Sequence, residues 1–161
     1  MLHEIFAYCP ETGDLIWRVD RVTGFGGTIS KAGDVAGCKD GRGYVVVKTG
    51  GKRYYAHRVA WLLHYGEEAP QHIDHINGDK SDNRLCNLRA ATPSQNRCNV
   101  RSAAKPASGF KGVVRHYNRF ASYIRVQGEK KYLGVFDTPE QAHAAYAAAA
   151  EKYHGEFACV S

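Results

Sequence analysis

A run of small and polar residues, RSAAKPAS at positions 101–108, interrupts the chain between two stretches with hydrophobic patterning. The run contains one proline and has no apolar periodicity, which is typical of a linker. It separates residues 1–100 from residues 109–161, and each part is large enough for only one small hydrophobic core. The sequence therefore predicts two small domains joined by a linker.

The positive charge of the chain is concentrated around this linker. The 161 residues include 22 Lys and Arg against 16 Asp and Glu, which gives a net charge of +6. Residues 101–135 contain eight basic residues and one acid, Glu129, so this segment carries +7 and the remaining residues together carry −1. A local excess of this size predicts a polyanionic partner, most often a nucleic acid.

The rest of the composition excludes several classes of protein. No stretch approaches the roughly 18 apolar residues of a membrane-spanning helix, so we expect no membrane partner. The N-terminus, MLHEIFAYCPETGD, has no basic region followed by an apolar run, and no secretory signal is visible. The five cysteines are odd in number and include no CxxC pair. This pattern argues against disulfides and structural zinc, and favours a reducing cytoplasm.

The front part is predicted to contain a hairpin followed by a helix. Two β-rich runs flank Gly50-Gly51, which predicts a hairpin over residues 43–56. Apolar residues at helical spacing then predict a short helix over residues 57–65, which Gly66 ends. The first 42 residues are rich in glycine and indicate little about chemistry.

The tail is predicted to form three strands and one helix. The strand candidates are residues 113–115, 120–126 and 130–136. Thr138 and Pro139 have the residue types of a helix start, and an Ala-rich helix follows to about residue 154. With the front part, this order predicts an α+β fold whose tail is a small three-stranded antiparallel sheet packed on one helix.

Residues 72–96, HIDHINGDKSDNRLCNLRAATPSQN, hold the densest group of polar side chains. Their pattern predicts a strand over 72–76, a turn at Asn77-Gly78, a second strand over 85–91 and a helix that starts at Thr92-Pro93.

This segment also contains the residue types of a metal-dependent hydrolase. The carboxylate of Asp74 and the amide oxygen of Asn96 are suitable ligands for Mg²⁺ or Mn²⁺. His75 has the pKa range of a general base, and with a metal and a polyanion it indicates phosphodiester hydrolysis. Neighbours on a regular strand point to opposite faces, so Asp74 and His75 share one site only if the strand bends or ends there.

Residues 57–96 resemble the HNH endonucleases, specifically the homing-type members that phages and introns encode. The matching segments are HRVAW at 57–61, IDHINGDKSDNRLCNLR at 73–89 and ATPSQN at 91–96. The resemblance implies a ββα-metal nuclease core in which Asp74 and Asn96 bind one divalent metal and His75 activates water. It also implies that Asn87 holds the active-site loop and orients His75.

Residues 108–157 resemble a second family, the APETALA/ethylene-response-factor type of DNA-binding domain. The resemblance covers essentially the whole tail and implies that the sheet enters the major groove of duplex DNA. Alternation along the second strand places Ala121, Tyr123 and Arg125 on the predicted DNA face. The positions that the resemblance assigns to DNA binding are Arg115, Arg119, Tyr123, Arg125, Lys130, Lys131 and Tyr132.

Together these patterns predict a metal-dependent DNA endonuclease. We expect a nuclease domain over residues 1–100 with its motif core at 57–97, the linker at 101–108 and a DNA-binding domain over 109–161. His72 and Asn83 are candidates for supporting the site without binding the metal. The chain is expected to act on double-stranded DNA as a monomer or weak dimer, in the cytoplasm of a bacterial or phage-infected cell. The alternatives are a non-catalytic, sequence-specific DNA-binding regulator and, more weakly, a zinc-stabilised adaptor.

Overall fold

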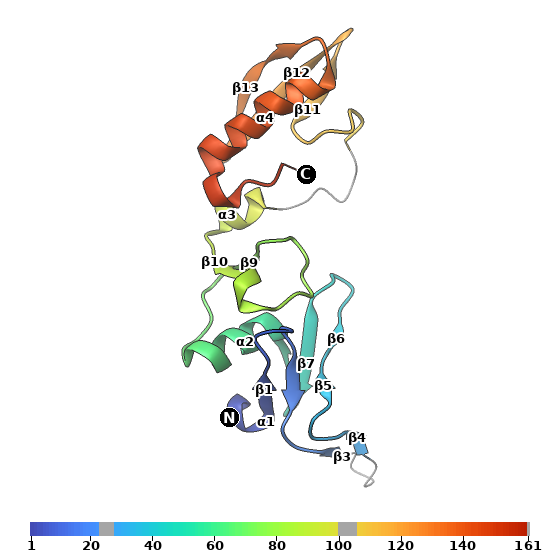
Figure 1. Ribbon diagram of the computed structural model, residues 1–161, viewed down its shortest axis with the longest axis vertical. Helices are drawn as coiled ribbons and strands as arrows, with labels where there is room; N and C mark the ends of the chain where they lie inside the picture. Colours follow the sequence, from blue (N-terminus) through green and yellow to red (C-terminus); the bar gives the residue numbers. More distant parts are fainter. Residues whose placement is uncertain (23–27, 100–105, 161) are drawn as a thin grey trace. The chain divides into compact units, whose positions relative to one another are not determined.

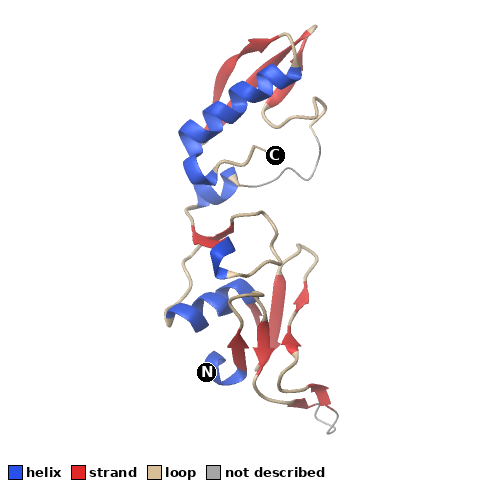
Figure 2. Cartoon of the chain, viewed as in Figure 1, coloured by secondary structure: helices blue, strands red, loops and turns tan. Residues whose placement is uncertain are grey.

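The computed structural model describes residues 1–22, 28–99 and 106–160, and it divides the chain into two compact units (Figure 1). The first unit comprises residues 1–91 and the second residues 92–161. Both combine helices with small antiparallel sheets, which confirms the predicted mixture of helix and strand (Figure 2). Within the described ranges, no helix is long and apolar enough to cross a membrane.

The first unit is built from short elements that are contiguous in sequence. Two three-stranded sheets, of order β1-β2-β5 and β6-β7-β8, are accompanied by the strand pairs β3-β4 and β9-β10. The elements are α1 (Leu2–Ile5), β1 (Phe6–Tyr8), β2 (Leu15–Trp17), β3 (Arg21–Val22), β4 (Thr28–Ser30), β5 (Val35–Ala36), β6 (Cys38–Lys39), β7 (Val45–Thr49), β8 (Lys52–Tyr55), α2 (Ala56–Tyr65), β9 (Ile73–His75), the 3₁₀ turn η1 (Leu85–Asn87) and β10 (Leu88–Ala90).

The core of the first unit lies between the hairpin β1-β2 and helix α2. Phe6 and Trp17 are register partners, and their rings lie 4.6 Å apart. Leu15, Val47 and Val59 also belong to the buried cluster, which joins both larger sheets to the helix. Each fully buried side chain of this size contributes about 1.5–3 kcal/mol of transfer free energy. This cluster is therefore the main source of stability for the elements that surround the polar segment 72–91.

The structure confirms the predicted hairpin and helix of the front part. Strands β7 and β8 pair on either side of Gly50-Gly51. Helix α2 begins at Ala56, one residue before the predicted start, and Gly66 caps it with a φ of 74°. The helix packs against β1, β7 and β8, so its first turn follows directly on the sheet.

The second unit consists of a short helix, a three-stranded sheet and a longer helix. Strands β11, β12 and β13 are antiparallel in that order, and α4 packs on the sheet with Tyr146, Ala149 and Ala150 around Ile124. The elements are α3 (Pro93–Cys98), β11 (Val113–His116), β12 (Arg119–Val126), β13 (Glu129–Phe136), α4 (Pro139–His154) and the 3₁₀ turn η2 (Gly155–Phe157).

Both helices of the second unit begin as their sequences predict. The hydroxyl of Thr92 accepts a hydrogen bond from the Gln95 amide, and the Gln95 side chain accepts one from the Thr92 amide in return. Thr138 accepts from the Gln141 amide in the same way at the start of α4. These caps satisfy backbone donors that have no partner within the helix.

Helix α3 belongs by its contacts to the second unit, because it packs against η2. Lys111 also donates a hydrogen bond to the carbonyl of Cys98 at the end of this helix, at 3.5 Å. Residues 101–105 of the predicted linker lie outside the described residues. The division between the units thus falls at residues 91 and 92, whereas the predicted front domain extended to residue 100.

The sheet of the second unit has an irregularity that simple alternation along one strand does not reveal. Ser122 pairs with Gly134 but Tyr123 pairs with Tyr132, so Leu133 is an extra residue on β13. Ala121 and Ser122 are both buried although they are neighbours on one strand. Ala121 is therefore inaccessible on the predicted DNA face. The longer side chains of Tyr123 and Arg125 remain on that face.

We expect Gly112→Ala to destabilise the second unit more than Gly109→Ala. Both glycines have positive φ, +78° and +79°, so both substitutions impose backbone strain of about 1 kcal/mol or more. A Cβ at position 112 would also lie 2.1 Å from the Tyr146 ring, whereas a Cβ at position 109 meets nothing within 4 Å. Denaturant unfolding of both variants measures the difference, and equal losses would contradict the close packing of Gly112 on α4.

Candidate active site

Strand β9 places two ionisable residues in the interior, one after the other. Asp74 is 3% exposed and His75 is 5% exposed. The strand ends at His75, whose carbonyl accepts a hydrogen bond from the Gly78 amide across a tight turn. The sequence requires the strand to bend or end here if Asp74 and His75 are to share one site, and the strand does end at His75. Both side chains are buried here because polar partners surround them.

Asp74 is held by an arginine from the opposite strand. Arg89 is the register partner of Asp74 on β10, and its Nε and Nη2 donate to Asp74 Oδ2 at 2.9 and 2.7 Å. Both side chains are largely removed from solvent. A buried carboxylate requires such a partner, since an uncompensated charge in this position costs several kcal/mol. This pairing of Arg89 with Asp74 depends on strand register, and the sequence did not predict it.

His75 lies among an amide and two aromatic rings. Its Nε2 is 3.3 Å from Asn83 Oδ1, and its ring centre lies 5.2 Å from that of His57 and 6.0 Å from that of Tyr44. Burial lowers the pKa of His75, while the hydrogen bond to Asn83 and the charge of Asp74 oppose this shift. The neutral ring is thereby favoured, and a neutral imidazole is the form that can accept a proton.

Asn87 closes the loop that follows β9. Its Oδ1 accepts a hydrogen bond from the Asn77 amide at 2.9 Å, and its Nδ2 donates to the Asp82 carbonyl at 2.8 Å. Its own carbonyl accepts from the Ile76 amide. Asn87 is 5% exposed, so these bonds replace water for a buried amide. The geometry is that of a residue that holds the loop, which is the role that the family resemblance implies for it.

The loop is also supported by hydrogen bonds among its own side chains and by contacts from the N-terminal hairpin. Asp82 accepts hydrogen bonds from Arg84 and Asn77, and the bond from Arg84 is the main cause that lowers the pKa of Asp82 to about 2. The Tyr8 hydroxyl donates to the Asn83 carbonyl at 2.9 Å. The turn at Gly13 approaches this loop so closely that only glycine fits there, because a Cβ would lie 2.5 Å from the backbone nitrogen of Arg84. The first hairpin thus fixes the position of Asn83, and Asn83 contacts His75.

His57 is a component of this site that the sequence analysis did not assign. It was treated as a helix-start residue, yet it is 8% exposed and its ring stands at 84° to that of His75. The Tyr55 ring stacks on its other side at 23°. Burial, followed by the positive charges of His75 and Arg58, lowers the pKa of His57 to about 3. One signal was available, a histidine that immediately follows a β-rich run, but spacing alone does not relate it to His75.

The predicted metal ligands fit a hard divalent cation in their chemistry. Asp74 offers a carboxylate and Asn96 an amide oxygen, as Mg²⁺ and Mn²⁺ prefer. Asn96 lies on α3, which belongs to the second unit, so its pairing with Asp74 stays a prediction. In the described part of the chain, no three or more His, Cys, Asp or Glu side chains form a group that could hold a metal. His72, which was expected to support the site, is half-buried, and its carbonyl accepts from the Ala91 amide.

The predicted DNA-binding residues of the second unit divide between the two faces of its sheet. Cross-strand partners share a face, so Arg125 with Lys130 and Tyr123 with Tyr132 lie on the face opposite α4. Arg119 has the same strand parity and forms an ion pair with Asp137 at 2.8 Å. We call these five residues the open face: Arg119, Tyr123, Arg125, Lys130 and Tyr132.

Two of the predicted residues do not belong to the open face. Lys131 is the register partner of the buried Ile124, and its Nζ lies 4.7 Å from the centre of the Tyr153 ring on α4. Arg115 has the parity of Val113, which is 3% exposed, and so lies on the side that α4 covers. Alternation along β13 separates Lys131 from Lys130, and the register of β11 with β12 places Arg115 on the α4 side. A list of basic residues does not show this separation.

We expect His57 to make the first unit less stable as the pH falls from 7.5 to 5. An ordinary histidine in the unfolded chain takes up a proton near pH 6.5, whereas folded His57 resists protonation down to about pH 3. The unfolded state is therefore favoured by about 2 kcal/mol at pH 5 relative to pH 7.5. Chemical unfolding at both pH values measures this loss. His57→Phe should remove most of the dependence, and an unchanged dependence in that variant would contradict the burial of a neutral His57.

Comparison with known proteins places the site in a family context. Residues 54–98 match the sequence profile of the HNH endonuclease family, from β8 to the end of α3. The chain is also similar to an uncharacterized HNH endonuclease of Acanthamoeba polyphaga mimivirus, with 32% identity over 104 residues. That alignment covers 63% of this chain and 54% of the viral protein, so the chain spans about half the length of this relative. The matched segment contains Asp74, His75 and Asn87, and the chain therefore carries an HNH endonuclease domain at residues 54–98.

Proposed function

We propose that this protein is a metal-dependent DNA endonuclease of the homing type. The observation that carries the proposal is the buried pair Asp74 and His75 at the end of β9, within the segment that matches HNH endonucleases. A carboxylate and an imidazole at the end of one strand have no structural need to be buried together. In this proposal the pair supplies a proton acceptor and a metal ligand, which is the combination that phosphodiester hydrolysis requires.

His75 is the proposed general base. Its Nε2–H donates to the amide oxygen of Asn83 at 3.3 Å, so the neutral ring would accept the proton of the attacking water at Nδ1. This bond and the edge-to-face ring of His57 fix the plane of the imidazole. Asn87 contributes by holding the loop from which Asn83 reaches His75. A ring held in one orientation loses less entropy when it takes up the proton, so these neighbours raise its efficiency as a base.

Asp74 and Asn96 are the proposed ligands of one Mg²⁺ or Mn²⁺. When bound, the ion supplies a Lewis acid that stabilises the charge of the pentacovalent phosphorus and of the departing 3′ oxygen. Arg89 fixes the orientation of the Asp74 carboxylate in the interior. Two protein ligands leave coordination positions for water and phosphate oxygens, as is usual for Mg²⁺ at nucleotide sites.

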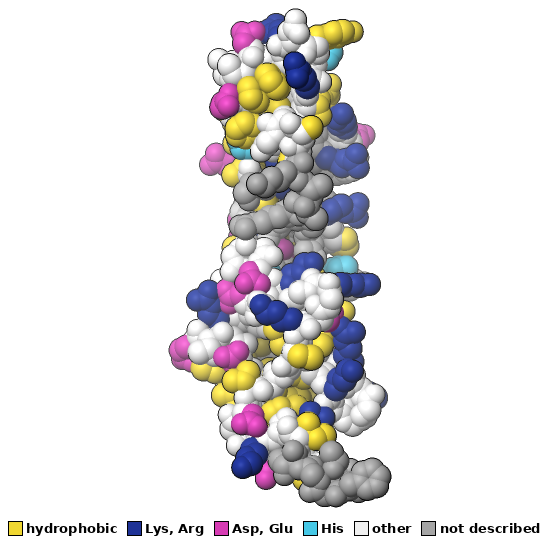
Figure 3. Space-filling view, turned by 90° about the vertical axis from the view of Figure 1, so that its right-hand side faces the viewer, with side chains coloured by type: hydrophobic (Ala, Val, Ile, Leu, Met, Phe, Trp, Pro, Cys, Tyr) yellow, Lys and Arg dark blue, Asp and Glu magenta, His cyan; other side chains and the backbone are white. Residues whose placement is uncertain are grey.

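The second unit is the proposed DNA-binding domain, of the APETALA/ethylene-response-factor type. Arg125 and Lys130 face one another on the open face, and like charges in this position repel each other. Lys130 Nζ lies 3.8 Å from the centre of the Tyr123 ring, which relieves part of the repulsion. A phosphate between the two cations would relieve the rest. Figure 3 shows Lys and Arg side chains gathered along one edge of this unit, as a DNA-binding surface requires.

The biological setting is proposed from the sequence and from the viral relative. A reducing cytoplasm suits a chain with five free cysteines, and a phage or other viral origin accords with the source of the relative. One site in each chain favours a monomer or weak dimer that nicks DNA or cuts it in two steps.

A second candidate function is that of a DNA-binding regulator that does not cut. The ion pair of Asp74 with Arg89 favours it, because a guanidinium already occupies one carboxylate oxygen of the proposed metal ligand. The next experiment separates the two functions.

We expect the purified protein to nick or linearise supercoiled plasmid with Mg²⁺ or Mn²⁺ and to be inactive with EDTA. His75→Ala should lower the cleavage rate by about 10²–10⁴-fold, since it removes the base. Asp74→Ala should abolish cleavage, and both variants should still bind duplex DNA. His64→Ala, an exposed residue at the end of α2, is the control and should cut normally. Binding without cleavage by the wild-type protein would establish the regulator instead.

We expect duplex binding by the open face to depend steeply on salt. Arg125→Gln or Lys130→Gln should each reduce the slope of log affinity against log salt by about 1, because each removes a phosphate contact. Fluorescence anisotropy over a salt series measures this slope. Lys131→Gln is the matched control, since it neutralises the neighbouring lysine on the α4 side. An equal effect of Lys131→Gln would show that the two faces of the sheet are not distinguished by DNA.

A further inference from the structure

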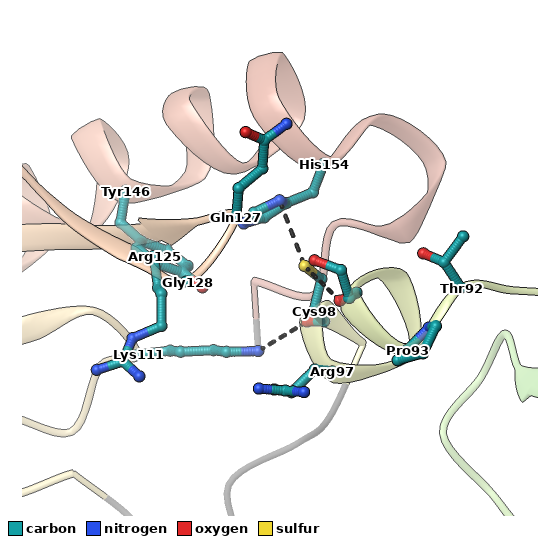
Figure 4. A pocket seen from close by; sticks show the side chains of 11 residues that line it. Thr92, Pro93, Arg97, Cys98, Lys111, Arg125, Gln127, Gly128, Tyr146 and His154 are labelled. Carbon is teal, nitrogen blue, oxygen red and sulfur yellow. Dashed lines mark hydrogen bonds between the residues drawn. The ribbon is translucent and has the colours of Figure 1, made fainter.

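The second unit contains a cavity of about 600 Å³ between α3, the β12–β13 turn and α4 (Figure 4). One wall is formed by the first turn of α3 and by Arg97 and Cys98. Lys111 and Arg125 form a second wall, and Tyr146 and His154 of α4 form a third. A volume of this size accommodates a ligand much larger than a water molecule or a simple ion.

The charges that line the cavity all have one sign. Arg97, Lys111 and Arg125 contribute three cations, and no Asp or Glu is among its described lining residues. Lys111 donates to the Cys98 carbonyl at 3.5 Å, which fixes its ammonium group beside α3 (Figure 4). Three cations around one hollow repel each other, and an anionic ligand would offset that repulsion.

The opposite wall consists of Cys98 and His154, whose side chains contact each other. Cys98 Sγ lies 3.4 Å from His154 Nδ1 and donates to the Ser94 carbonyl at 3.2 Å. Burial raises the pKa of the Cys98 thiol and lowers that of His154, so both groups favour their neutral forms. The neutral side chains of Cys98 and His154 form a weakly polar surface together with the Tyr146 ring, and a sugar ring can pack against this surface.

The cavity continues from the open face of the sheet. Arg125 belongs to both, since it is the register partner of Lys130 on the open face and also lines the cavity. Arg97, the residue that follows Asn96 on α3, also lines the cavity. A strand of DNA that lies on the open face would therefore reach α3 through this cavity, entirely within the second unit.

We propose that this cavity binds one sugar-phosphate unit of the DNA backbone, with the phosphate at Arg97, Lys111 and Arg125. The proposal deepens the proposed function and rests on it. It assigns α3 a second role, because the helix that carries Asn96 would also hold the DNA strand. A free nucleotide or phosphate has the same chemistry as the backbone, and the experiment distinguishes these sources.

The first test measures binding of the full-length protein to a fluorescent duplex in EDTA, where no cleavage occurs. Arg97→Gln and Lys111→Gln should each lower the slope of log affinity against log salt by about 1. Lys111→Arg should restore the slope, which separates the charge from a structural role of the side chain. Lys152→Gln, an exposed cation of α4 outside the cavity, is the matched control and should bind as the wild type does. Wild-type slopes in both cavity variants would overturn the proposal.

The second test uses Cys98 as a reporter of the cavity. Alkylation by iodoacetamide, followed for each cysteine by mass spectrometry, should slow at Cys98 when duplex DNA is added. Thymidine monophosphate and inorganic phosphate are the comparison probes and should protect Cys98 only at much higher concentration. Protection by thymidine monophosphate but not by DNA would overturn the assignment to the backbone.

The outcomes separate this proposal from the nuclease proposal. Weaker binding in the cavity variants, together with a wild-type protein that never cuts plasmid, would support the cavity and refute the nuclease. Normal cleavage and normal DNA binding in the cavity variants would refute the proposal that the cavity binds DNA and would leave the nuclease proposal intact.

Discussion

The candidate site depends on the burial of two ionisable residues in succession on a strand of three residues. Asp74 and His75 could not be removed from water without partners, because each would lose several kcal/mol of solvation. Arg89 compensates the first from the neighbouring strand, and Asn83 satisfies the second from the following loop. The loop in turn needs Asn87 to hold it and the hairpin around Gly13 to support it. Much of the first unit can be understood as support for these two side chains.

The second unit carries several cationic side chains on one small sheet, and their placement is its main constraint. Strand alternation divides the basic residues between two faces, one of which the helix α4 covers. Arg125 and Lys130 remain together on the open face, whereas Lys131 lies over Tyr153. The concentration of like charge has a cost in stability, which DNA bound as we propose would offset.

The sequence predicted the elements that local chemistry controls. Thr92 and Thr138 start helices because their hydroxyls accept from the first turn, and Gly50-Gly51 forms a hairpin because glycine adopts positive φ. The HNH segment could also be identified from the sequence, because its residue types and their spacing lie within one continuous stretch of chain. The sequence missed His57 and the partner of Asp74, because both contacts join residues from separate elements. Residues 85–87 form a 3₁₀ turn and not the start of a strand, since Asn87 bonds to the loop.

By itself, the sequence determined the mixed helix and strand composition, the helix starts, the position of the HNH segment and the location of the positive charge. These follow from interactions between residues close along the chain or from counting. Tertiary structure alone decided that Arg89 pairs with Asp74, that His57 packs on His75, and that Lys131 and Arg115 lie apart from the open face. The physical reason is that strand register and helix docking fix which side chains meet, and both depend on burial of apolar surface across the whole unit.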